Sequence, residues 1–187
     1  FSFTSYDSVT AVSYVLDKVS YADYYAVKTD SAVFHDALHT KRETGDSIMS
    51  IKNTVNGKNK SQEVLLALPN NENIRRIRLI WHGDTMYVAS AYLHPLNAQA
   101  PQVNKYFDEV KILKPAKPTT LFKKKTKELL QDLTSGNAER FAKAADRITE
   151  VEFDETDLPM LKEAMVKQYT DEEENHTDIY DNIADII

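Results

Sequence analysis

The sequence contains no cysteine, only four glycines and a single tryptophan among its 187 residues. Without cysteine it has no disulfide, no thiol nucleophile and no thiolate metal ligand. The glycines stand far apart, so neither a phosphate-binding glycine loop nor a GxSxG nucleophile turn can be built. The sequence contains no apolar run of about 18 residues, so no transmembrane helix is predicted. It also contains no signal-peptide pattern. The sequence therefore excludes enzymes that use a thiol nucleophile, a phosphate-binding glycine loop or a GxSxG turn. No membrane-spanning segment is predicted.

Charge is distributed unevenly along a chain that otherwise has the composition of a globular protein, with 42% hydrophobic and 28% charged residues. Residues 1–113 hold 12 basic and 12 acidic residues, whereas residues 128–187 hold 5 basic and 17 acidic ones. Between them, residues 111–130 contain seven lysines before a single acid, Glu128. Nucleic-acid binding requires a coherent positive face, so this pattern argues against a nucleic acid as the main partner.

The first 113 residues are predicted to form an α+β domain with an antiparallel sheet and packed helices. Between positions 7 and 28, β-branched and aromatic residues favour two strands with a turn near Asp17. Apolar residues at helical spacing then indicate a helix that begins near Asp30 and ends near Gly45. The early part of the domain is therefore expected to be a strand pair followed by one helix.

The rest of this domain is expected to consist mainly of strands. Residues 47–93 contain three or four strand patterns separated by Asn, Gly and Pro turn residues. A closing helix over 98–107 and a short strand over 109–113 follow. Within the pattern IRRIRLIW, we expect the apolar residues to point inward and Arg76 and Arg78 to point toward water.

Several of these segments carry a family resemblance. The chain order is an early helix ending in DALHTKRETGD, then NG, EVLLALP, RRIRLIWHGDTMYVASAY and a last helix ending in YFDEVKIL. Over residues 7–113 this order resembles bacterial α+β domains of the PsbP and Mog1 type. The resemblance implies an antiparallel sheet with helices packed on it, in families that mostly serve as binding or accessory modules. It supplies no catalytic residues.

The second part of the chain is predicted to be all-α. Pro115 and Pro118 disfavour both helix and strand, so residues 114–118 are interpreted as a stiff Lys/Pro linker. Over residues 119–187, four amphipathic helices are expected to begin near 119, 137, 156 and 177. One helix pair thus recurs after roughly 40 residues, the interval of HEAT-like repeats, although a four-helix appendage is nearly as compatible with the pattern.

Two features lead us to expect a fragment of a larger bacterial protein. The chain opens without methionine, and it ends on an apolar helical face that includes Ile183 and Ile187. The resemblance, together with strands rich in Ser, Thr, Tyr and Asn, favours a periplasmic or cell-envelope location, with the cytoplasm as the alternative. The lack of cysteine does not decide between these compartments.

Three sets of residues are candidates for a site. His35 and His39 stand one helical turn apart and are the candidates for a metal, with His82 or His94 as a further ligand, although the HExxH pattern is absent. Tyrosines on the predicted strands, Tyr24, Tyr25 and Tyr87 among them, are candidates for a stacking surface. Lysines of the basic run, with Lys123, Lys124 and Lys125 at its centre, are candidates for an anionic partner.

The function expected from these observations is a non-catalytic binding or scaffolding module with a protein partner and no cofactor. The alternative is a metal-dependent enzyme that uses His35 and His39. A third hypothesis is attachment to an anionic surface through residues 114–127. The acidic stretch 170–178 lacks the glycine and ligand order of a calcium loop, so we interpret it as a solvated connection.

Overall fold

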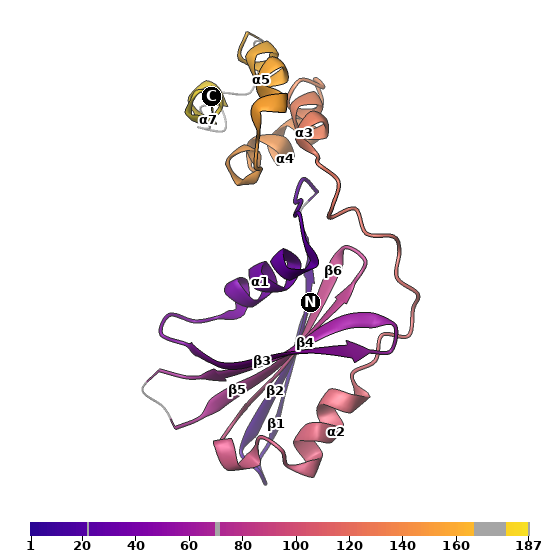
Figure 1. Cartoon of the computed structure of the whole chain (residues 1–187), viewed down its shortest axis with the longest axis vertical. Coiled ribbons are helices and arrows are strands. Elements are labelled where there is room, and N and C mark those ends of the chain that lie inside the picture. The colour runs from indigo at the N-terminus through magenta and orange to yellow at the C-terminus, as the bar shows by residue number, and fades with distance from the viewer. Residues whose placement is uncertain (22, 70–71, 167–178, 187) are drawn as a thin grey trace. The chain divides into compact units, whose positions relative to one another are not determined.

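The computed structural model describes residues 1–21, 23–69, 72–166 and 179–186 and divides into two compact units (Figure 1). The sheet unit consists of residues 1–21 and 28–120, and the helical unit consists of residues 22–27 and 121–187. The division after Thr120 lies close to the predicted linker over 114–118. The inclusion of residues 22–27 in the helical unit was not predicted.

Six strands form one sheet in the sheet unit. The strands are β1 (Ser2–Asp7), β2 (Val12–Ser20), β3 (Ser47–Asn56), β4 (Asn59–Ala67), β5 (Ile74–His82) and β6 (Thr85–Leu93). Their order in the sheet is β1-β2-β6-β5-β4-β3, and every neighbouring pair is antiparallel. β1 and β3 are therefore the two edge strands. The predicted turns at Asn56-Gly57 and Gly83-Asp84 join β3 to β4 and β5 to β6.

One helix packs on each face of this sheet (Figure 1). Helix α1 (Asp30–Lys41) begins after Thr29, whose side chain accepts a hydrogen bond from the Ala32 amide at 3.2 Å. Helix α2 (Pro101–Glu109) has Pro101 in its first turn, where the missing N–H group is tolerated. The α+β class with an antiparallel sheet is thus confirmed.

The two helices bury different side chains of the same strands because successive residues of a strand face opposite sides. Ile77 and Leu79 are fully buried on the α1 face, and the Trp81 ring packs edge-on against Phe34 at 6.3 Å. Their inward orientation was predicted correctly. On the other face, Phe107 of α2 is fully buried in a cluster with strand residues that include Leu93.

Three predictions for the sheet unit are wrong. β2 runs through Asp17 without a turn, because the chain reverses earlier, between β1 and β2. Residues 109–113 form no strand among the described residues. Arg76 and Arg78 do not point toward water: the side chain of Arg76 is only 8% exposed and that of Arg78 13%, since α2 covers this face of the sheet.

The helical unit contains α3 (Thr126–Leu133), α4 (Ala138–Ala145), α5 (Leu158–Met165) and α7 (Ile179–Ile186). The first helix begins at Thr126 and not at Thr119 or Thr120. Helix α4 begins where a helix was expected, near residue 137, and Asn137 caps it by accepting a hydrogen bond from the Arg140 amide at 3.1 Å. Residue 177, near which the last helix was expected to begin, lies outside the described residues. No helix of the described residues combines the length and the apolar character needed to span a bilayer.

A segment from the early part of the chain completes the core of the helical unit. Tyr24 is 6% exposed and belongs to the same cluster as Leu129, Phe141, Leu161 and nearby residues of the helices. Its hydroxyl donates a hydrogen bond to Asp132 Oδ2 at 2.7 Å. Burial, with this hydrogen bond, raises the pKa of Tyr24 above its ordinary value. The helical unit therefore depends on residues that lie about a hundred positions earlier in the sequence.

Candidate functional site

The candidate site lies on the α2 face of the sheet unit, beside the segment that follows α2. We call residues 110–118, which have no regular secondary structure, the strap. Groove A, of about 870 Å³, lies between the strap and the turn that joins β3 to β4. Groove B, of about 560 Å³, lies between the strap and residues of β2 and β6. Residues 111–115 line both grooves, so the strap separates them.

The strap is fastened to the sheet at both ends. Near its start, the Asn56 side chain donates a hydrogen bond to the Val110 carbonyl at 2.8 Å. Just after its end, Asp84 accepts hydrogen bonds from the Thr119 hydroxyl at 2.8 Å and from the Thr120 amide at 2.7 Å. The Thr120 hydroxyl also donates to Asp84, at 2.9 Å. The segment interpreted as a stiff linker is therefore held against the hairpin turn of β5 and β6.

A matched pair of glycines tests how firmly the strap packs. Gly57 and Gly83 both occupy hairpin turns with φ of 62° and 61°, so alanine at either position meets the same left-handed strain. A Cβ at Gly57 would meet nothing within 4 Å, whereas one at Gly83 would lie 2.9 Å from the Lys117 carbonyl oxygen. The two substitutions therefore differ in one contact, the one with the strap.

We expect Gly57→Ala to destabilise the sheet unit by about 1 kcal/mol and Gly83→Ala by about 1 kcal/mol more, because the strap must shift. Urea unfolding of the two variants measures the difference, and amide exchange in residues 110–120 should rise only in Gly83→Ala. Equal destabilisation without a change in exchange would show that the strap does not press on this turn.

An ion-pair cluster lies next to groove A, and Arg78 belongs both to the cluster and to the lining of the groove. Arg78 of β5 donates a hydrogen bond through Nε to Glu63 Oε1 of β4 at 2.9 Å, and through Nη1 to the Phe107 carbonyl at 2.5 Å. Arg76 donates through Nη1 to Asn104 Oδ1 at 2.6 Å, and its guanidinium lies 4.5 Å from the Phe107 ring centre. Burial works to raise the pKa of Glu63, but the Arg78 hydrogen bond and the two guanidinium charges outweigh it and hold this pKa below its ordinary value.

Lysines surround both grooves and carry exposed positive charge. They come from β2, from the β3–β4 turn and from the strap, and are Lys18, Lys58, Lys111, Lys114 and Lys117. Within the described ranges, no ion pair joins any of them to a carboxylate. The two acids of the grooves are engaged, since Asp84 binds the end of the strap and Asp108 lies 3.6 Å from Arg78. The grooves are therefore suited to an anionic ligand.

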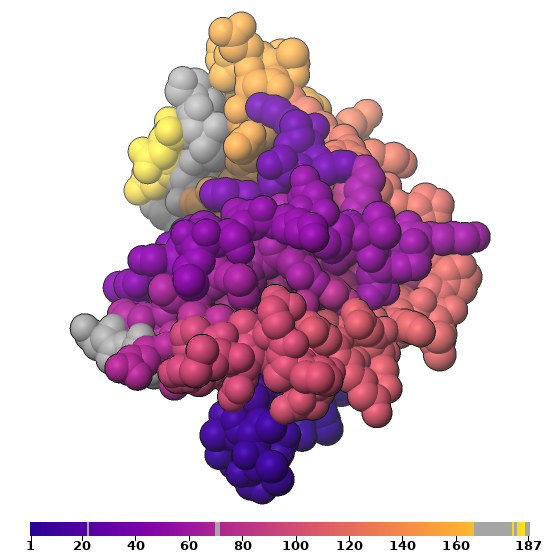
Figure 2. Space-filling model, turned by 60° about the horizontal axis from the view of Figure 1, so that its bottom comes forward, coloured from indigo at the N-terminus to yellow at the C-terminus, as the bar shows by residue number. Residues whose placement is uncertain are grey.

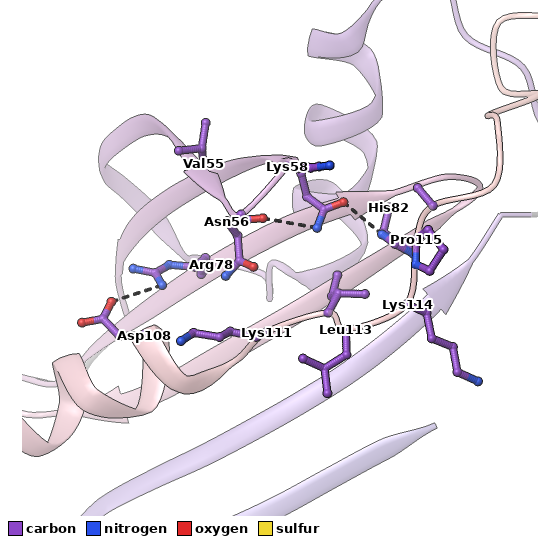
Figure 3. A pocket seen from close by; sticks show the side chains of 14 residues that line it. Val55, Asn56, Lys58, Arg78, His82, Asp108, Lys111, Leu113, Lys114 and Pro115 are labelled. Atoms are coloured by element: carbon purple, nitrogen blue, oxygen red, sulfur yellow. Dashed lines mark hydrogen bonds and ion pairs between the residues drawn. The ribbon is translucent and has the colours of Figure 1, made fainter.

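His82, at the end of β5, lines both grooves (Figure 3). Its Nδ1 lies 2.9 Å from Asn59 Oδ1, so Nδ1 carries the proton when this hydrogen bond is formed. The imidazole ring also packs edge-on against the Tyr87 ring at 6.2 Å. Lys111 and Asn56 point into groove A beside it (Figure 3), and Lys58 of the β3–β4 turn also lines this groove. In the space-filling view, the strap lies beside the β3–β4 hairpin (Figure 2).

The structure separates the tyrosines that the sequence grouped together. Tyr87 lines groove B and is half-buried. Tyr24 and Tyr25 are not on a strand, and the ring of Tyr24 is buried in the helical unit and offers no stacking surface. The prediction placed them together because aromatic residues favour strands, a preference that tertiary packing overrides here.

Two of the three predicted lysine candidates serve contacts inside the helical unit. Lys124 lies 2.8 Å from Asp154 and 2.7 Å from Asp157, and the hydrogen bonds to these carboxylates raise the pKa of Lys124. Lys125 donates a hydrogen bond to the Tyr25 carbonyl at 3.1 Å. Lys123 is exposed. Lys18 and Lys58 were missed as site residues because nothing in the sequence shows that strands bring them to the strap.

The predicted metal ligands lie on the exposed side of α1. The rings of His35 and His39 are nearly parallel, with centres 6.4 Å apart, and His35 Nδ1 lies 3.1 Å from Asp36 Oδ1. No group of three or more metal-binding side chains occurs among the described residues, and neither His82 nor His94 joins the pair. The metal-dependent enzyme stays a prediction. It requires a bound metal equivalent that is lost in His35→Ala.

Comparisons with known proteins find similarity in structure but not in sequence. No family model matches the sequence, and no curated protein sequence matches it. A protein of unknown function from Pseudomonas aeruginosa, PA94, is similar in structure with a TM-score of 0.45 and 10% identity, over 62% of this chain and 83% of that one. The Ran-binding protein Mog1p of Saccharomyces cerevisiae is similar with a TM-score of 0.31 and 17% identity, over 52% of this chain and 57% of its own.

A Mog1 protein is thus among the structural neighbours. Both TM-scores lie below 0.5, so the α+β class rests on the strands and helices of this chain and not on these likenesses. The chain spans little more than half of the yeast protein. The HEAT-like repeat stays a prediction.

Proposed function

We propose that the chain is a non-catalytic protein-binding module whose sheet unit binds an extended acidic segment of a protein partner along the strap. The observation that carries the proposal is the set of five exposed lysines around grooves A and B, none of which is paired with an acid among the described residues. Uncompensated charge of one sign in a groove attracts a ligand of the opposite sign and speeds its association.

The shape of the site favours a chain-like ligand. The two grooves run on either side of the strap and share the side chains of residues 111–115. Leu113, which is 92% exposed, stands between the lysines and offers an apolar contact. An exposed apolar residue within a charged rim is typical of a protein interface. A segment that combines acidic and apolar side chains satisfies both features.

The test uses a defined probe, a fluorescent peptide of about twelve residues in which glutamate and valine alternate. We expect it to bind the whole chain, and the double variant Lys111→Glu/Lys114→Glu to lower the affinity on the order of tenfold or more. Anisotropy titrations at low and at high salt measure the affinity, which should fall as salt rises because the contacts are charged.

The control is the double variant Lys123→Glu/Lys127→Glu, which makes the same charge change at two exposed lysines outside the grooves. It should leave the affinity for the peptide nearly unchanged. If both double variants weaken binding equally, the peptide responds only to net charge and the groove proposal is wrong.

Two further probes address the other anionic partners. Vesicles rich in acidic lipid test the hypothesis of surface attachment through residues 114–127, and a single-stranded oligonucleotide tests the expectation that no nucleic acid is bound. A protein partner is supported if the peptide, but neither of these two polyanions, shows groove-dependent binding, that is, binding weakened by Lys111→Glu/Lys114→Glu. Stronger groove-dependent binding of either polyanion overturns it.

Several predictions from the sequence accompany this proposal unchanged. We propose that the helical unit belongs to a HEAT-like array of helical hairpins, supported by the neighbouring helices α3 and α4 and by their shared core.

We also keep the bacterial source, the larger parent protein and the periplasmic or cell-envelope location as proposals. Fractionation of the source cell, followed by detection of the chain, tests the location.

A further inference from the structure

The outer edge strand β3 is unusually open for a strand of its length. It spans ten residues, all of them exposed or half-buried. Large apolar side chains lie on it with high exposure, at 43% for Ile48, 50% for Ile51 and 79% for Val55. Its only charged residue is Lys52, and it contains no proline. Edge strands normally carry several charges, prolines, bulges or a covering segment that prevent pairing. From Ser50 to Asn56, β3 carries one lysine, no proline and no bulge, so this part of the edge can accept another strand.

The two faces of β3 have different chemistry. Ile51 and Val55 pair with Val64 and Lys60 of β4, on the side of the sheet that carries α1. Lys52 pairs with Glu63 and belongs to the opposite side, together with Asn56. The close view agrees: the side chains of Val55 and Asn56 project to opposite sides of the chain, and that of Asn56 points into groove A (Figure 3). A strand added beside β3 therefore meets apolar side chains on one face and a lysine with polar side chains on the other.

We propose that the free edge of β3 binds its partner by strand addition, and that the partner segment alternates acidic with β-branched apolar residues. Its acidic side chains would lie toward Lys52 and its apolar ones toward Ile51 and Val55. The inference rests on the proposed function, because the β3–β4 turn that ends this edge also lines groove A. An acidic segment that leaves the groove at this turn continues directly along β3.

The register of β3 sets the length of the added strand. The pairing with β4 is irregular between Ile48 and Ser50, which marks a bulge. A bulge bends the strand and interrupts regular pairing. The regular edge therefore runs from Ser50 to Asn56, and we place the added strand along these residues.

Charge decides between a partner and a second copy of this chain. β3 carries one lysine and no acid, so a second β3 strand offers no carboxylate to Lys52. A separate acidic segment supplies the complementary charge and matches the preference of the neighbouring groove. The structure therefore favours a partner strand over pairing of two β3 strands.

Hydrogen–deuterium exchange of the whole chain, with and without the alternating Glu/Val peptide, tests the inference. In an antiparallel or parallel ladder every second residue of an edge strand directs its N–H outward. We expect alternate amides between Ser50 and Asn56 to gain at least tenfold protection when the peptide is bound, while amides of the other edge strand, β1, do not change. Peptide binding without protection in β3 overturns strand addition.

Variants on the two faces supply an independent readout. Lys52→Glu and Ile51→Lys change half-exposed or exposed side chains, so the sheet should remain folded. Each is expected to weaken peptide binding about fivefold or more. A peptide of the same composition, with its glutamates and valines in two blocks, should bind more weakly than the alternating one, because only alternation gives each face one chemistry.

The outcomes separate this inference from the proposed function. If Lys111→Glu/Lys114→Glu abolishes binding while Lys52→Glu, Ile51→Lys and β3 exchange show no effect, the groove proposal stands and strand addition is wrong. If the lysine double variant also has no effect, both are wrong. Protection of β3 that depends on protein concentration and not on peptide would assign the edge to a second copy and overturn the inference.

Discussion

Tyr24→Ala is expected to destabilise the helical unit by about 3–5 kcal/mol, the range for removal of a large aromatic side chain from a core. The ring is 6% exposed and packs among residues of α3, α4 and α5, so its loss leaves a cavity that these short helices cannot close. Since a domain of this size has only about 5–15 kcal/mol of total stability, the helical unit should unfold at a clearly lower urea concentration than in the original chain.

The measurement is hydrogen–deuterium exchange resolved by segment, because the two units need not unfold together. Amides of α3 and α4 should exchange faster in Tyr24→Ala, while those of β5 and β6 keep their protection. Tyr24→Phe retains the ring and removes only the hydrogen bond to Asp132, so its effect should be about 1 kcal/mol.

The neighbouring Tyr25 provides the matched control, since it is half-buried and outside the core cluster. Tyr25→Ala should destabilise the helical unit much less than Tyr24→Ala. A chain truncated to residues 119–187 lacks the Tyr24 ring and should show the same loss of protection. Native-like protection in that fragment would contradict the role that we assign to Tyr24.

The second large effect is expected for Glu63→Gln, at about 3 kcal/mol at neutral pH, because removal of one partner leaves buried charges uncompensated. Arg76 and Arg78 are 8% and 13% exposed, and Glu63 is the carboxylate that both contact. Glutamine keeps the size of the side chain but supplies no charge. The thermal or urea midpoint of the sheet unit measures this loss.

The pH dependence of this effect has a definite sign. The pKa of Glu63 is lower in the folded chain than its ordinary value of 4.5, because the hydrogen bond from Arg78 and the two guanidinium charges outweigh the effect of burial. Its contribution is therefore complete above about pH 5 and is lost as the pH falls through the folded pKa. The difference between the original chain and Glu63→Gln should shrink on acidification. A difference that stays constant down to about pH 2 would contradict the assignment.

A surface pair offers the control for Glu63. Lys105 and Glu109 stand one turn apart on α2 at 3.7 Å, with side chains 72% and 68% exposed. Glu109→Gln should change stability by less than about 0.5 kcal/mol at neutral pH, since water and salt screen exposed pairs. A loss as large as that of Glu63→Gln would show that burial is not the cause.

Local sequence signals predicted much of the sheet unit. The turn residues at Asn56-Gly57 and Gly83-Asp84 reverse the chain as expected, because glycine accepts the positive φ of such turns. The apolar face of β5 was predicted from the alternation of its residues, and the helix after Thr29 from the helical spacing of its apolar residues. In the helical unit, Asn137 caps α4 through a hydrogen bond from the amide of Arg140, only three residues away. Each of these features depends on residues close together in the chain.

Two of the errors share one cause, which is contact between residues far apart in the sequence. Arg76 and Arg78 were expected to face water because they alternate with apolar residues, yet α2 covers them and Glu63 supplies their counter-charge. Tyr24 was assigned to a strand from its residue type, yet it completes a core formed by helices that begin a hundred residues later. A helix that covers a strand and a packing partner far away in the chain leave no signal in the neighbouring sequence.

The sequence by itself determined the α+β class, most strand and helix types, the basic run and the absence of thiol and glycine-loop chemistry, because composition, period and turn residues act locally. Only the tertiary structure decided the candidate site. It brings Lys18 of β2 and Lys58 of the β3–β4 turn to the lysines of the strap, holds the strap through Asp84, and leaves β3 as an open edge. These features arise from the strand order and from the packing of α2. Both bring together residues that are far apart in the chain, and spacing in the sequence does not reveal such contacts.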